Sequence, residues 1–106
     1  MEQICVVTTV VDARPVADVL AAAAVAGRLA ACAQVGGKVD STYWWRSGVE
    51  TSTEWSVLFK TAPDRVAALV DQLRGTHPYE VPEILVSRVE CGDPAYAAWV
   101  HENTRA

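Results

Sequence analysis

Residues 77–83 read HPYEVPE and hold the side chains best suited to chemistry: an imidazole, a phenol and two carboxylates. Pro78 and Pro82 fix their own φ angles and push the preceding residues, His77 and Val81, toward extended geometry. No helix can therefore pass through this stretch. A segment this stiff and this polar is predicted either to lock a packing joint or to hold a binding site.

Within this segment, His77 and Glu80 are candidate metal ligands, since neutral imidazole and carboxylate groups both coordinate metal ions. In a fully extended chain Glu80 points away from His77. A chelate by the two therefore needs a turn after Pro78 or a second subunit. The alternative for His77 is a purely structural role as a hydrogen-bonded interface residue.

Cys32 is the third candidate metal ligand, because thiolate together with imidazole suits copper. It is equally well interpreted as a small buried hydrophobic residue. Cys5 is expected in the core, and Cys91 beside a glycine is expected to be a peripheral thiol. Three widely spaced cysteines without a CxxC motif predict reduced thiols and a cytoplasmic location.

Lys60, Tyr79 and Glu83 form a second candidate set, for a small-molecule ligand. Lys60 precedes a predicted helix start, where it can meet an anion or simply pair with a carboxylate. Tyr79 and the Trp44–Trp45 pair either line a ligand pocket or pack between subunits.

The composition excludes several classes of function. A net charge of −4 with only two lysines argues against a nucleic-acid-binding face. No apolar run reaches transmembrane length, and the first residues are not those of a signal peptide. No phosphate loop, HExxH or supported Ser-His-Asp arrangement is present, so we expect no enzyme activity.

The first half of the chain predicts a strand at 4–11, buried on both faces, and then a helix. Asp12 is the expected helix cap, Pro15 fits the first turn and Gly27 ends the helix. Two long strands at 30–45 and 49–60 follow, joined by a turn at 46–48. The first of them is expected to bulge at Gly36–Gly37.

The second half predicts a helix that starts at a capping box in 61–64, carries an apolar stripe and closes at Gly75. A final core strand at 84–89 and a helix opened by Asp93–Pro94 complete residues 1–106 as one domain. This order indicates an α+β fold: a ferredoxin-like split βαβ sandwich with a C-terminal helix.

The two long strands do not fit a monomer. A strand of about 15 residues spans roughly 50 Å at ~3.3 Å per residue, whereas a helix of similar count spans about 22 Å. The hairpin must therefore overhang the helices and expose its aromatic residues, Tyr43, Trp44, Trp45 and Trp55. Large aromatics on an uncovered ribbon predict an interface with other copies of the chain.

Several motifs together resemble the CutA divalent-cation tolerance family: LAAC at 29–32, STYWW at 41–45 and HPYEVPEI at 77–84. The resemblance implies a trimer whose long ribbons wrap neighbouring subunits, broadly similar to PII-type signalling proteins, and a link to copper or another divalent metal ion. The chain departs from the family pattern at Thr8 and Thr9, where some members carry a cysteine. Thr76 likewise stands where some have a second histidine, so this chain has fewer candidate metal ligands.

Two functions follow from these observations. The first is a cytoplasmic homotrimeric metal-binding protein of copper or divalent-cation tolerance and homeostasis, with Cys32, His77 and Glu80 as ligands. The second is a PII-like signalling trimer that senses a small molecule in clefts between subunits, through Lys60, Tyr79 and Glu83. A purely structural assembly module would explain the aromatic residues and leave the polar HPYE block without a role.

Overall fold

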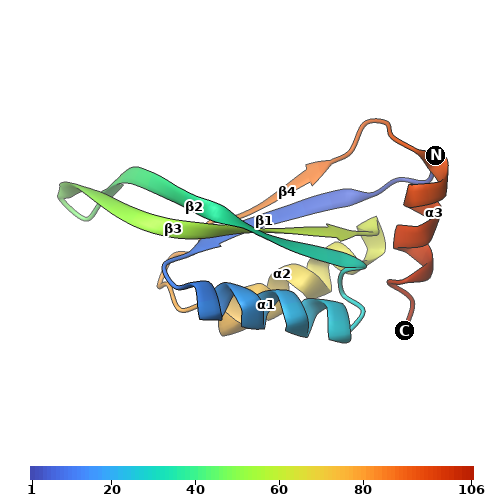
Figure 1. Cartoon of the computed structure of the whole chain (residues 1–106), viewed down its shortest axis with the longest axis horizontal. Helices are drawn as coiled ribbons and strands as arrows, with labels where there is room; N and C mark the ends of the chain where they lie inside the picture. The colour runs from blue at the N-terminus through green and yellow to red at the C-terminus, as the bar shows by residue number, and fades with distance from the viewer.

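A computed structural model describes all residues, 1–106, as a four-stranded antiparallel sheet in the order β2-β3-β1-β4. Helices α1 and α2 cover one face of this sheet, and α3 packs at the end remote from the ribbon tip (Figure 1). The predicted α+β, ferredoxin-like fold is confirmed. The elements are β1 (Cys5–Val11), α1 (Arg14–Ala26), β2 (Cys32–Trp45), β3 (Gly48–Thr61), a 3-10 turn (Pro63–Arg65), α2 (Val66–Thr76), β4 (Ile84–Arg88) and α3 (Pro94–Glu102).

The core lies between the sheet and the two helices. Alternate residues of β1 are buried, while the residues between them are half-buried, so the strand is fully covered on one face only. Phe59 of β3 and Leu69 and Leu73 of α2 are almost completely buried in the same cluster. The helical spacing of the leucines and the two-residue period of the strands place these side chains in one layer.

Helix α1 begins without the predicted cap. Its N-cap is Ala13, with extended backbone, and no side chain accepts a hydrogen bond there. Asp12 stands one residue too early to cap the helix, and its carboxylate lines a cavity instead. The predictions of Pro15 in the first turn and Gly27 at the end are confirmed.

The ribbon of β2 and β3 pairs continuously from Cys32–Lys60 to Trp45–Gly48, except for a register shift between Val35 and Lys38. This shift confirms the predicted bulge. A Cβ on Gly36 would lie only 2.4 Å from Ser56 Oγ, so a larger residue there would require the Ser56 side chain to move. At the tip, the positive φ of 57° falls on Arg46 rather than on a glycine.

The ribbon extends well beyond the rest of the sheet, as Figure 1 shows, and it sets the longest extent of the molecule, 45 Å against 25 and 22 Å. β1 pairs with β3 only from Thr61 to Trp55, so the part of β3 before Trp55 pairs with β2 alone. The predicted overhang is confirmed. Trp55 is a correction, because it pairs with Val11 and packs against the main core at the base of the ribbon.

The second half departs from the sequence predictions at three points. Thr61 donates its hydroxyl hydrogen to Leu29 O instead of capping a helix, and a 3-10 turn precedes α2. Helix α2 continues through Gly75 to Thr76. β4 is an edge strand rather than a core strand, because β1 is its only partner and nothing covers its outer side.

The C-terminal helix begins as predicted, with the Asp93 carboxylate accepting from Tyr96 N at 3.0 Å. His101 is half-buried, and its ring Nε2 lies 2.6 Å from Gln3 O, so it ties α3 to the N-terminal segment. None of the helices has the length and apolar character needed to cross a bilayer.

Candidate functional site

The overhanging ribbon has one chemically rich face. Tyr43 and Trp45 are two residues apart on β2, so their side chains lie on the same face of the ribbon. Tyr43 pairs with Glu50 of β3, so Glu50 lies on this face as well. Because strand side chains alternate, Ser52 and Glu54 share the face of Glu50. The pattern E-T-S-T-E at 50–54 thus places two carboxylates and a hydroxyl beside the aromatic rings.

The loop at 77–83 faces this side of the ribbon, and His77 anchors it. The Thr9 hydroxyl donates its hydrogen to Glu83 O at 2.6 Å, so toward the His77 ring it can only accept. His77 Nε2 lies 3.0 Å from both Thr9 Oγ1 and Val10 O and therefore carries the hydrogen. The other ring nitrogen, Nδ1, accepts from Tyr79 N at 3.1 Å. His77 is thus a neutral imidazole with both nitrogens in use.

Burial lowers the pKa of His77 below its ordinary value, although the Val10 carbonyl and the charges of Asp12 and Glu54 oppose this shift. Protonation would place a hydrogen on Nδ1 and break the bond from Tyr79 N. A metal ion would likewise have to displace one of the existing partners. Within one chain, His77 thus anchors the loop through contacts of both ring nitrogens.

Tyr79 crosses from the loop to the ribbon. Its hydroxyl donates to Glu54 Oε2 at 2.7 Å, and Glu54 is only 5% exposed. Burial, followed by the hydrogen bond and negative charge of Glu54, raises the pKa of Tyr79 far above its ordinary value. The pair joins residues that are 25 apart in sequence and fixes the loop against the base of the ribbon.

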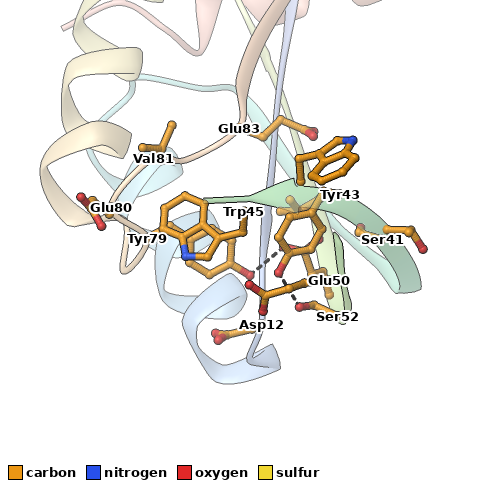
Figure 2. A pocket seen from close by; sticks show the side chains of 14 residues that line it. Asp12, Ser41, Tyr43, Trp45, Glu50, Ser52, Tyr79, Glu80, Val81 and Glu83 are labelled. Atoms are coloured by element: carbon orange, nitrogen blue, oxygen red, sulfur yellow. Dashed lines mark hydrogen bonds between the residues drawn. The ribbon is translucent and has the colours of Figure 1, made fainter. Parts of the chain in front are cut away.

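Ribbon and loop border an open cavity of about 760 Å³. Figure 2 shows the rings of Tyr43, Trp45 and Tyr79 facing this space, with the carboxylate of Glu50 among them. The lining combines four aromatic residues with five carboxylates and contains no lysine, arginine or histidine. These residues are Tyr43, Trp44, Trp45 and Tyr79, and Asp12, Glu50, Glu54, Glu80 and Glu83.

Arg46, at the ribbon tip, reaches back to the mouth of this cavity. Its guanidinium carbon lies 5.1 Å from the centre of the Trp45 ring, and its Nη2 lies 3.4 Å from Glu80 Oε2. Both partners of this ion pair are largely exposed, so the pair itself adds little stability. It does show that a cation can bind an aromatic face and a carboxylate together at this place.

The predicted metal ligands are not brought together within one chain. Cys32 pairs with Lys60, which pairs with Val6, whereas His77 contacts Val10. That offset is four residues along β1, roughly 13 Å at ~3.3 Å per residue. No group of three or more His, Cys, Asp or Glu side chains is close enough to hold a metal ion. Cys32, His77 and Glu80 therefore do not fit a shared ion in one chain.

The predicted small-molecule residues are divided in the same way. Tyr79 and Glu83 line the cavity, but Lys60 lies at the other end of β3, where its ammonium group donates to Gln34 Oε1. Cys32 pairs with Lys60 across the ribbon and lies beside Tyr96 of α3. Burial, together with the nearby Cys32 thiol, raises the pKa of Tyr96.

The sequence did not predict that Asp12, Tyr43, Glu50 and Glu54 would line this cavity. The signal available was the polar alternation at 50–54 opposite an aromatic run, which indicates a ribbon face made of carboxylates and rings. Asp12 had no such signal, because its position depends on where α1 begins.

Residues 4–103 match the model of the CutA1 divalent ion tolerance protein family. The chain is 40% identical over 91 residues to Protein CutA of Mus musculus, covering 86% of this chain and 51% of the relative. It therefore spans about half the length of that mouse protein. It is 36% identical over 104 residues to the divalent-cation tolerance protein CutA of Salmonella newport, covering 98% and 90% of the two chains.

Solved structures agree in fold. The divalent cation tolerance protein Cut A1 of Thermus thermophilus superposes with a TM-score of 0.92 at 34% identity, covering 96% of this chain and 99% of that one. The divalent ion tolerance protein CutA1 of Ehrlichia chaffeensis has a TM-score of 0.94 at 24% identity, over 100% and 99% of the two chains, which shows the shared fold alone. With the family model matching nearly its whole length, this chain belongs to the CutA1 divalent ion tolerance protein family.

Proposed function

We propose that this protein acts in divalent-cation tolerance as a cytoplasmic homotrimer that binds a divalent metal ion, with copper as the first candidate. The observation that carries the proposal is the match of residues 4–103 to the family. The relatives named above bear CutA or divalent-cation tolerance names, which favours this function over PII-like signalling.

Assembly is supported by apolar side chains that one chain leaves uncovered. Trp44 is 74% exposed at the ribbon end, Val81 in the loop is 69% exposed, and Leu85 on the edge strand β4 is 59% exposed. Exposed apolar groups on an unpaired strand edge and a projecting ribbon favour association. Three copies arranged by a closed rotation would cover these groups without leaving a free interface.

Association also offers the predicted metal ligands a way to meet. A threefold assembly repeats Cys32, His77 and Glu80 around one axis, so ligands that are far apart in one chain come from different copies. The Cys32 thiol and the exposed Glu80 carboxylate are available without breaking a buried contact. His77 would first have to release Tyr79 N or its Nε2 partners.

The test is copper and zinc titration of metal-stripped protein by calorimetry, after the mass has been measured by sedimentation. Cys32→Ser and Glu80→Gln should each weaken copper binding at least tenfold while the protein remains trimeric. Cys91→Ser is the matched control, because it removes an exposed thiol outside this set. Equal copper affinity in all four proteins, or a folded monomer, would contradict the proposal. Fractionation of cells that express the chain tests its location.

A further inference from the structure

The cavity between ribbon and loop has the size of a small-molecule site rather than of a metal site. Its volume of about 760 Å³ lies within the range of roughly 300–1,000 Å³ that is typical of ligand pockets. Its carboxylates are spread around the wall, and no three of them come close enough to hold a single metal ion. Asp12, Glu50, Glu80 and Glu83 are exposed, so a ligand that pairs with more than one of them needs positive charges at separated points.

The aromatic rings give this negative cavity a second preference. Tyr43, Trp45 and Tyr79 present ring faces or edges to the same space as Glu50 (Figure 2). Ring faces attract organic cations, which combine positive charge with an apolar skeleton. An anionic ligand would meet mainly like charge here, because five carboxylates and no basic residue line the cavity.

Glu54 offers one carboxylate oxygen to this space. It is only 5% exposed and lines the cavity, and only its Oε2 is bonded, to the Tyr79 hydroxyl. Its Oε1 has no hydrogen-bond partner in the chain. No fully buried side-chain oxygen in the chain lacks a partner, so Oε1 is open to the cavity, where a positive group of a ligand can reach it.

Arg46 shows the same recognition chemistry at the mouth of the cavity. Its guanidinium lies over Trp45 and beside Glu80, a ring and a carboxylate that both line the cavity. This contact satisfies Glu80 alone. The other four lining carboxylates make no ion pair within the chain: Asp12, Glu50, Glu54 and Glu83.

We propose that this cavity binds a linear di- or polyamine, with one ammonium group at Glu54 Oε1, a further one toward Glu50 or Asp12, and the methylene chain against the rings of Tyr43, Trp45 and Tyr79. A flexible chain of separated charges matches carboxylates that are dispersed around an aromatic wall. This site goes beyond the metal-binding function proposed above and does not depend on it.

The experiment is calorimetric titration of the metal-stripped, assembled protein with spermidine, and with 1,6-hexanediol as an uncharged probe of similar shape. Spermidine should bind at micromolar to low millimolar concentration and change the tryptophan fluorescence, whereas hexanediol should not bind. Glu54→Gln keeps an oxygen for the Tyr79 hydroxyl and removes the charge, so it should weaken spermidine at least tenfold. Asp71→Asn, an exposed carboxylate on α2 outside the cavity, is the matched control and should change the affinity less than twofold.

Glu50→Gln and Trp45→Leu provide further variants if Glu54→Gln does not fold, and each should weaken spermidine about fivefold. Equal weakening by Asp71→Asn and the cavity variants would overturn the proposal, because it would indicate general attraction to an acidic protein. Absence of spermidine binding would overturn it as well. That result is expected if a side chain from a second copy of the chain fills the cavity.

Discussion

The two ends of this sheet are built differently. At the helix-covered end, apolar side chains such as Phe59 and Leu69 are fully buried and complete their packing within one chain. At the ribbon end, the contacts are polar and long-range, such as Tyr79 with Glu54 and Arg46 with Glu80, while Trp44 remains exposed. The closed end supplies stability, and the open end offers binding groups and surface for association.

Phe59→Ala should have the largest effect if the helix-covered end carries the stability of the fold. The ring is completely buried in the main core, so its removal leaves a cavity and should cost roughly 3–5 kcal/mol in the free energy of unfolding. Urea unfolding followed by far-UV circular dichroism measures this cost. Thr42→Ala, on an exposed part of the ribbon, is the control, and a loss similar to that of Phe59→Ala would remove the contrast between the two ends.

Trp44→Ala tests whether the open end is covered in the assembly. In one chain the side chain is 74% exposed, so truncation in a monomer should be nearly neutral. If neighbouring subunits bury it, the substitution should cost about 3–5 kcal/mol and shift the mass toward monomer or aggregate. Sedimentation and thermal melting of the same samples give the answer. An unchanged mass and Tm would place this ring in solvent and refute the interface.

Tyr79→Phe should show how much the hydrogen bond from Tyr79 to Glu54 contributes to the free energy of unfolding, apart from the packing of the ring. The ring stays, but Glu54 Oε2 loses its only donor, and Glu54 is almost fully buried. Leaving a buried acceptor unsatisfied costs about 1–3 kcal/mol. Tyr43→Phe is the matched control, because its hydroxyl bonds Ser52 in an exposed position. Equal unfolding free energies for the two variants would show that the Tyr79–Glu54 bond does not hold the loop.

The difference between the two ends also explains how much the sequence could predict. The strands, the bulge at Gly36 and the α2 stripe follow from local periodicity, and all three are confirmed. Helix starts were predicted less well. Asp12 lines the cavity and does not cap α1, and the Thr61 hydroxyl donates to Leu29 O and does not cap α2. Trp55 was predicted on the overhang, but it pairs with Val11 of β1 and therefore lies at the core.

The candidate site was predictable only in part. Tyr79, Glu80 and Glu83 were found from one stiff motif, and all of them line the cavity. Glu54 and Arg46 meet this motif across 25 and 34 residues of sequence, through contacts that no local pattern encodes. The metal set of Cys32, His77 and Glu80 remains a prediction that needs several copies of the chain.

The smallest expected effect is a pH dependence that arises from His77 at the junction of the two ends. Burial lowers the pKa of His77 in the folded protein, so the unfolded chain takes up a proton at higher pH than the folded one. Stability therefore rises with pH wherever the unfolded state holds more protons. The contribution of His77 is complete above the unfolded pKa of roughly 6.5, and it is lost as the pH falls from there toward the folded pKa. Unfolding in urea at about pH 7.5, 6.5 and 5.5 measures this slope.

His77→Gln should flatten the slope, since glutamine does not titrate. Protonation of His77 breaks the bond from Tyr79 N to Nδ1, so amide exchange at Tyr79 should accelerate over the same pH range. The exchange readout locates the effect in the loop rather than in the fold as a whole. A slope that persists in His77→Gln would show that other titrating groups cause it. A Tyr79 amide that stays protected at the lowest pH in the unchanged protein would show that the bond to His77 Nδ1 does not hold the loop.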